Sequence, residues 1–64
     1  MSEKRYHVVP RGDGRWAVKR QGADRATRVF ELRQTATALG KRLALGGVLY
    51  VHRRDGTIEE RMEL

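Results

Sequence analysis

The chain is predicted to fold as a small α+β domain, in which an antiparallel sheet built from two β-hairpins carries one α-helix on one face. Two segments rich in strand-forming residues are each interrupted by a turn signal, Gly12-Asp13-Gly14 in the first and Asp55-Gly56 in the second. An Ala/Leu-rich stretch with helical periodicity lies between them. The 64 residues allow a single domain, residues 1–64, and no cysteine is present to stabilise it.

The first hairpin is predicted from Tyr6-His7-Val8-Val9-Pro10 and Trp16-Ala17-Val18-Lys19-Arg20. Its register is left open by the sequence. A two-residue loop would pair Val9 with Val18, whereas a three-residue loop would pair Val8 with Val18. Because one step of register exchanges the two faces of a strand, the sequence does not decide whether Tyr6 or His7 faces away from the core.

A turn at residues 21–24 and a short extended segment from Arg25 to Phe30 are expected next. From about Leu32 to Leu45 the chain is rich in Ala, Leu, Arg, Gln and Lys, which favour a helix. Gly46-Gly47 is a strong signal for its end. The apolar stripe of this helix would consist of Leu32, Ala36, Leu39 and Leu43.

The second hairpin is predicted from Val48–Arg53 and Ile58–Met62, joined by a two-residue Asp55-Gly56 loop. That register places Tyr50 opposite Arg61 and His52 opposite Glu59, both on the exposed face, with His52 and Glu59 as a cross-strand charge pair. The predicted core face then consists of Leu49, Val51, Ile58 and Met62. Together the elements follow the order β-β-(β)-α-β-β.

Three stretches of the first half carry a family resemblance: Tyr6–Pro10, Gly14–Lys19 and Gly22–Ala26. With the Val29-Phe30 step, the Ala/Leu helix and the late Val-His-Arg-Arg-Asp-Gly hairpin, the chain resembles small bacterial proteins grouped as domain of unknown function 2188. The resemblance covers nearly the whole chain and implies a compact α+β fold. It implies no activity. The helix opens with Arg33-Gln34-Thr35-Ala36 instead of the acidic residues expected for the family, and it is therefore more basic.

The charge of the chain is uneven. It carries fourteen Lys and Arg against eight Asp and Glu, a net charge of +6. Residues 1–54 hold a net charge of +9 and residues 55–64 a net charge of −3. Such a field attracts polyanions. Arg outnumbers Lys by eleven to three, which favours directed contacts with phosphate or carboxylate over solubility alone.

These observations predict a non-enzymatic, basic binding module that binds nucleic acid with low sequence specificity. Phosphate contacts would come from Lys and Arg side chains, and a strand-borne tyrosine would stack on bases. The alternative is a protein-interaction module or homodimer, with an acidic protein or a second copy as partner, because small sheets expose edge strands. The residues predicted to contact nucleic acid are Arg11, Arg15, Lys19, Arg20, Tyr50, Arg53 and Arg54.

No catalytic constellation, cofactor motif or metal site is predicted. Two histidines, His7 and His52, without cysteine or an evident third ligand are more typical of ordinary strand residues; they would ligate a metal only if adjacent strands brought them together. Gly40-Lys41-Arg42 lacks the strand and the Lys-Ser/Thr step of a phosphate loop. No apolar run spans a bilayer and the first residues lack a signal-peptide pattern, so no membrane association and a cytoplasmic location are expected.

Overall fold

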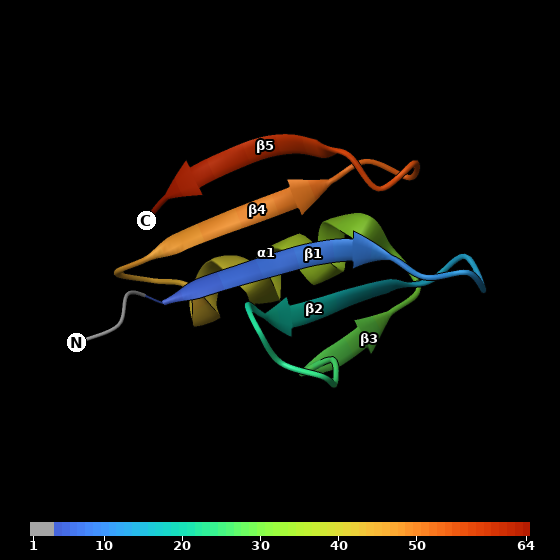
Figure 1. Ribbon diagram of the computed structural model, residues 1–64, viewed down its shortest axis with the longest axis horizontal. Coiled ribbons are helices and arrows are strands. Elements are labelled where there is room, and N and C mark those ends of the chain that lie inside the picture. Colours follow the sequence, from blue (N-terminus) through green and yellow to red (C-terminus); the bar gives the residue numbers. More distant parts are fainter. Residues whose placement is uncertain (1–3) are drawn as a thin grey trace.

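The computed structural model describes residues 4–64. Its elements follow the order β-β-β-α-β-β, with every strand belonging to one sheet and the helix lying across it (Figure 1). They are β1 (Arg5–Pro10), β2 (Trp16–Arg20), β3 (Arg28–Phe30), α1 (Arg33–Leu43), β4 (Val48–His52) and β5 (Ile58–Glu63). The expectation about the first residues falls partly on 1–3, which lie outside this range.

The predicted fold class is confirmed, with one difference in strand direction. The sheet has five strands in the order β3-β2-β1-β4-β5. Three of the pairings are antiparallel, but the central pair, β1 with β4, is parallel, with Val8 opposite Val51. The sheet is therefore mixed and not purely antiparallel. The cause is the crossover: parallel neighbours need a long connection, and β2, β3 and α1 supply it.

The first hairpin adopts the three-residue loop, since Val8 pairs with Val18 and Arg11 N–H donates to Arg15 O at 2.8 Å. This register turns Tyr6 toward the core and His7 toward the uncovered face of the sheet. We call that face, which carries His7, Tyr50 and His52, the open face.

Helix α1 packs on the sheet through small residues. Ala36 and Gly40 are its buried positions. A Cβ built on Gly40 would lie 2.9 Å from Leu49 Cδ1 and 3.3 Å from Val8 Cγ2, so the helix approaches the central strands closely. The predicted stripe is confirmed at Ala36, Leu39 and Leu43. It fails at Leu32, which is 56% exposed and is the N-cap residue, with extended backbone, before the first helical turn.

The second hairpin departs from the predicted register at its loop. Met62 pairs with Leu49, Arg61 with Tyr50 and Glu60 with Val51, as expected, but a bulge after Val51 makes Ile58 the partner of His52. Ile58 therefore leaves the core face and is 50% exposed. The predicted pair of His52 with Glu59 is wrong for the same reason.

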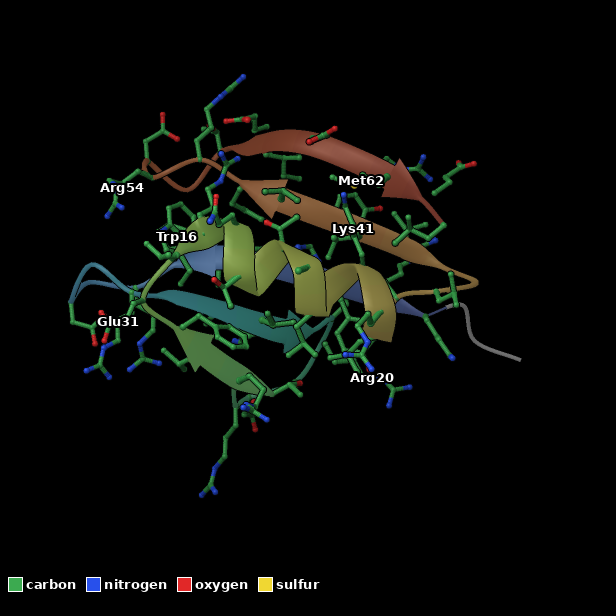
Figure 2. The ribbon with its side chains drawn as sticks, turned by 180° about the vertical axis from the view of Figure 1, so that it is seen from behind. Trp16, Arg20, Glu31, Lys41, Arg54 and Met62 are labelled. Carbon is green, nitrogen blue, oxygen red and sulfur yellow. The ribbon has the colours of Figure 1, made fainter. Side chains whose placement is uncertain are left out.

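The helix covers only part of the sheet. It contacts β1, β2, β3 and β4, whereas β5 extends beyond it (Figure 2). Trp16 is buried to 4% exposure, as expected for the largest side chain of so small a core, and Phe30 is half-buried. Among residues 4–64, α1 is too short and too polar to cross a membrane.

Gly47 is the glycine at which an added side chain would meet the closest neighbouring atom. A Cβ built there would lie 1.9 Å from the carbonyl oxygen of Lys4, which accepts the N–H of Val48 at 2.7 Å. Gly47→Ala must therefore displace the start of β4 from β1. We expect the free energy of unfolding in urea to fall by about 2 kcal/mol or more. The matched control is Gly12→Ala, since Gly12 has no neighbour within 4 Å; equal stability of the two variants would contradict this reading.

Candidate nucleic-acid interface

Ten of the basic side chains lie at the two ends of the domain, five at each. The turn end is where β1 and β4 finish, and it comprises residues 11–15, 31–33 and 53–59. The opposite end is where β1 begins and where β2 and α1 finish. These placements follow from the parallel pairing of β1 with β4 and the antiparallel pairing of β1 with β2.

At the turn end, most of the arginines are paired with carboxylates. Arg15 Nε lies 3.4 Å from Glu31 Oε1, and Arg11 Nε lies 3.7 Å from Asp13 Oδ2. Glu59 accepts from two arginines, Arg33 at 3.0 Å and Arg53 at 3.7 Å. The positive charge of this end is consequently largely balanced by its own acidic residues.

The remaining arginine of the turn end covers the tryptophan. The guanidinium carbons of Arg54 and Arg33 lie 5.2 and 5.6 Å from the ring centroid of Trp16, which fits cation–π contact (Figure 2). This contact shields the edge of the core, and it occupies Arg54 in the free protein.

The balance of basic and acidic side chains is different at the opposite end. We call Lys4, Lys19, Arg20, Lys41 and Arg42 the basic end. Within residues 4–64, no carboxylate forms an ion pair with any of these five side chains. Lys41 and Arg42 belong to the last turn of α1, where cations complement the helix dipole. Arg20 lies beside the end of the same helix (Figure 2).

The open face carries a chain of hydrogen bonds between histidines. His52 Nδ1 lies 2.9 Å from the carbonyl oxygen of Gly56, and His52 Nε2 lies 2.9 Å from His7 Nδ1. His7 Nε2 in turn lies 3.0 Å from Gln21 Oε1. The two rings thus connect the β4–β5 turn to the end of β2.

Tyr50 lies beside these rings instead of standing free. Its ring centroid is 4.8 Å from that of His7, with 17° between the planes, so the two rings are stacked. On β5, the pKa of Arg61 is raised first by its hydrogen bond to Glu63 and then by one to Tyr50. One face of Tyr50 is therefore occupied by His7, and this leaves less of the ring for stacking on a base.

Two hollows accompany these features. A groove of about 820 Å³ runs between α1 and β5, with Arg33 and Lys41 on the helix side and Glu59 and Glu60 on the strand side. A small pocket of about 160 Å³ lies at the end of β2. We call it the β2 pocket; its lining includes His7, Lys19, Arg20, Gln21 and Gly22.

The structure separates the residues that the sequence groups together. It brings Arg11, Arg15, Arg53 and Arg54 to the turn end, Lys19 and Arg20 to the basic end, and Tyr50 to the open face. Lys4, Lys41 and Arg42 were not predicted as contacts; within the described residues none of them forms an ion pair, and Lys41 lines the groove opposite Glu59 and Glu60. Within residues 4–64, no group of three or more His, Cys, Asp or Glu side chains is arranged to hold a metal ion.

The fold and this surface define a small α+β domain with a mixed sheet and a single covering helix. Over residues 6–63 the chain matches the family described as "Uncharacterized protein conserved in bacteria (DUF2188)". The chain belongs to this family, which confirms the resemblance seen in the sequence. Comparison with curated proteins and with solved structures gives no match.

The turns of the turn end are fixed by aspartates whose ionised form is favoured. Thr57 donates to Asp55 Oδ1 through its hydroxyl at 2.7 Å and through its backbone N–H at 3.0 Å, and these bonds lower the pKa of Asp55. The pKa of Asp13 is lowered as well, mainly by the hydrogen bond that its carboxylate accepts from the backbone N–H of Arg15.

Thr57→Val removes the hydroxyl bond and keeps the N–H. We expect the pKa of Asp55 to rise toward its ordinary value in an NMR titration of the carboxyl carbons. Because the folded pKa is the lower one, the ionised group favours folding above the unfolded pKa, and this contribution is lost as the pH falls through the folded pKa. The Asp13 carboxyl is the internal control, and an unshifted Asp55 would rule out the hydroxyl as the principal cause.

Proposed function

We propose that the domain is a non-enzymatic module that binds nucleic acid with low sequence specificity, and that its basic end makes the principal phosphate contacts. The observation that carries this proposal is the absence of ion pairs at Lys4, Lys19, Arg20, Lys41 and Arg42 within the described residues. A cation without a carboxylate partner contacts phosphate without first breaking an ion pair.

The residues of the turn end play a smaller part in this proposal. Arg11, Arg15 and Arg53 each lie within 3.7 Å of a carboxylate oxygen, and a phosphate would have to compete with that oxygen. Phosphate contacts of this kind carry no sequence information, which is why low specificity is expected. Binding should weaken as salt rises because each contact releases counterions.

The test compares two triple variants that lose the same charge at opposite ends. Lys4→Gln/Arg20→Gln/Arg42→Gln neutralises the basic end, and Arg11→Gln/Arg15→Gln/Arg53→Gln neutralises the turn end. Fluorescence anisotropy is measured with a DNA duplex, its single strand and an RNA hairpin at about 50 and 200 mM salt. For the duplex, we expect the slope of log K against log salt to become less steep by about two to three in the first variant and by less than one in the second.

Equal losses in the two variants would mean that net charge alone matters, and the assignment to the basic end would fail. Absence of binding by the unmodified protein at the lower salt concentration would overturn the nucleic-acid function itself. The preferred ligand among the three would then decide between groove binding and single-strand binding.

A homodimer is the second candidate function, and the exposed edge of β5 favours it. The backbone N–H of Leu64 donates to Gly47 O, and its carbonyl oxygen accepts from the N–H of Gly46. The backbone N–H and C=O groups of the even-numbered residues of β5 therefore point toward β4. By alternation, the backbone groups of Arg61 and Glu63 point outward along the edge. An antiparallel β5–β5 pair centred on Met62 would place each Arg61 opposite Glu63 of the partner subunit. Registers centred on Glu60 or Arg61 place like charges opposite each other and are disfavoured.

Arg61→Glu would place four carboxylates together in this pairing, and Arg61→Glu/Glu63→Arg would restore the alternation of charge. We expect sedimentation velocity over a concentration series to show a dimer for the unmodified chain, a monomer for the single variant and a dimer again for the double variant. A monomeric unmodified chain, or a double variant that remains monomeric, would contradict β5 pairing.

A further inference from the structure

The β2 pocket combines the cation of Lys19 with imidazole and amide groups and contains no acidic residue. Its lining includes the imidazole of His7, Lys19, the amide of Gln21 and the backbone of Gly22. The side chain of Arg20, whose cross-strand partner is Tyr6, lies on the helix side of the sheet. None of these carries a carboxylate, and Lys19 and Arg20 form no ion pair within the described residues. The pocket adjoins the basic end, and its volume of about 160 Å³ accommodates a phosphate group.

The hydrogen bonds behind the pocket limit where the two histidines carry their protons. The carbonyl oxygen of Gly56 only accepts, so His52 Nδ1 must be the donor across their 2.9 Å contact. In a neutral His52 ring, Nε2 is then an acceptor, and His7 Nδ1 is the donor across the 2.9 Å contact between the rings. His7 Nε2 then carries no proton in a neutral ring, and it lies 3.0 Å from Gln21 Oε1, which as an amide oxygen also accepts.

This arrangement accepts one additional proton without losing a hydrogen bond. Placed on His7 Nε2, the proton is donated to Gln21 Oε1, which as an amide oxygen only accepts. Placed instead on His52 Nε2, it is donated to His7 Nδ1 when the proton of His7 moves from Nδ1 to Nε2, and the same three hydrogen bonds form. In both arrangements the pair holds one positive charge and His7 Nε2–H is a donor at the pocket.

We propose that the β2 pocket is a phosphate site in which His7 Nε2–H of the protonated His7–His52 pair, together with Lys19, contacts an oxyanion, so that nucleic-acid binding is coupled to uptake of one proton. This inference rests on the proposed function. A phosphate oxygen takes the place of Gln21 Oε1 as the acceptor for His7 Nε2–H, and charge-assisted bonds of this kind are stronger than neutral ones.

The groups around His7 explain why binding and protonation are coupled. Lys19 on β2 lies opposite His7 on the open face, and its charge opposes a positive charge on the histidine pair while the pocket holds no anion. Arg5 on β1 shares that face. Tyr50 and His52 on β4 are in ring contact with His7. On β5, Arg61 is paired with Glu63 at 2.8 Å. An anion in the pocket offsets the charge of Lys19 and favours the protonated pair.

The experiment measures affinity for single-stranded DNA between about pH 8 and pH 6, where an ordinary histidine changes charge, at constant ionic strength. For the unmodified chain we expect affinity to rise by about fivefold or more toward pH 6. His7→Gln should bind with an affinity that does not change over this range. Lys19→Gln should bind more weakly at every pH and keep the pH dependence, because it removes a fixed charge and leaves the histidine pair intact.

A second measurement locates the site independently of DNA. Inorganic phosphate is titrated at fixed pH into the unmodified protein, with sodium chloride of equal ionic strength as the control, and followed by NMR. We expect specific shifts at the amides of Gln21 and Gly22 and at the His7 ring. Shifts that are absent, or that centre on the turn end, would overturn the phosphate site.

The failure of this inference is distinguishable from the failure of the proposed function. If the unmodified chain binds DNA with a salt-dependent affinity but shows no pH dependence, or if His7→Gln retains the dependence, the coupling to His7 is wrong and the nucleic-acid function stands. If no DNA binding occurs at low salt, the function fails first. Phosphate shifts that persist in that case would assign the pocket to a free phosphate compound.

Discussion

The parallel pairing of β1 with β4 is the constraint on which the rest of the structure depends. β1 occupies the centre of the sheet and forms hydrogen bonds with β2 on one side and β4 on the other. The approach is tight where the pair begins, because the N–H of Val48 reaches the carbonyl oxygen of Lys4 at 2.7 Å and Gly47 leaves no room for a side chain. Because parallel neighbours need a crossover connection, α1 returns the chain across the sheet. Gly40 lets the helix lie directly over Val8 and Leu49.

The same pairing arranges the surface. Since β1 and β4 run in one direction, the turns that follow them lie at one end of the sheet, and the end of α1 lies at the other. The acidic residues fall mainly in or near the turns, as Asp13, Glu31 and Glu59 do, and they pair there with arginines. Because these carboxylates offset the arginines of the turn end, most of the net charge of +6 is left at the basic end. In the sequence, by contrast, Lys and Arg are distributed along most of the chain.

The pairing also joins the two histidines. His7 is opposite Tyr50 on the neighbouring parallel strand, and the ring of His52, two residues along, reaches it at 2.9 Å. The carbonyl of Gly56 at one side and the amide of Gln21 at the other complete the alignment. A surface that would otherwise present two separate imidazoles instead presents one nitrogen, His7 Nε2, to the β2 pocket. The proton uptake that we propose for this pair would couple the open face to the proposed phosphate-binding surface.

The sequence by itself determined the element order, the single helix, both hairpins and the family, because strand propensity, helical periodicity and Gly-Asp turn signals are local properties of the chain. It also predicted that Tyr50 lies opposite Arg61 and that Leu49, Val51 and Met62 face the core. It did not determine the parallel β1–β4 pairing or the bulge after Val51, which exposes Ile58 and separates His52 from Glu59, since both arise from contacts between distant segments. Nor did it distinguish the Lys and Arg side chains that form ion pairs from those that form none. That distinction depends on which residues the crossover brings within a few ångströms of one another, and only the tertiary structure decides it.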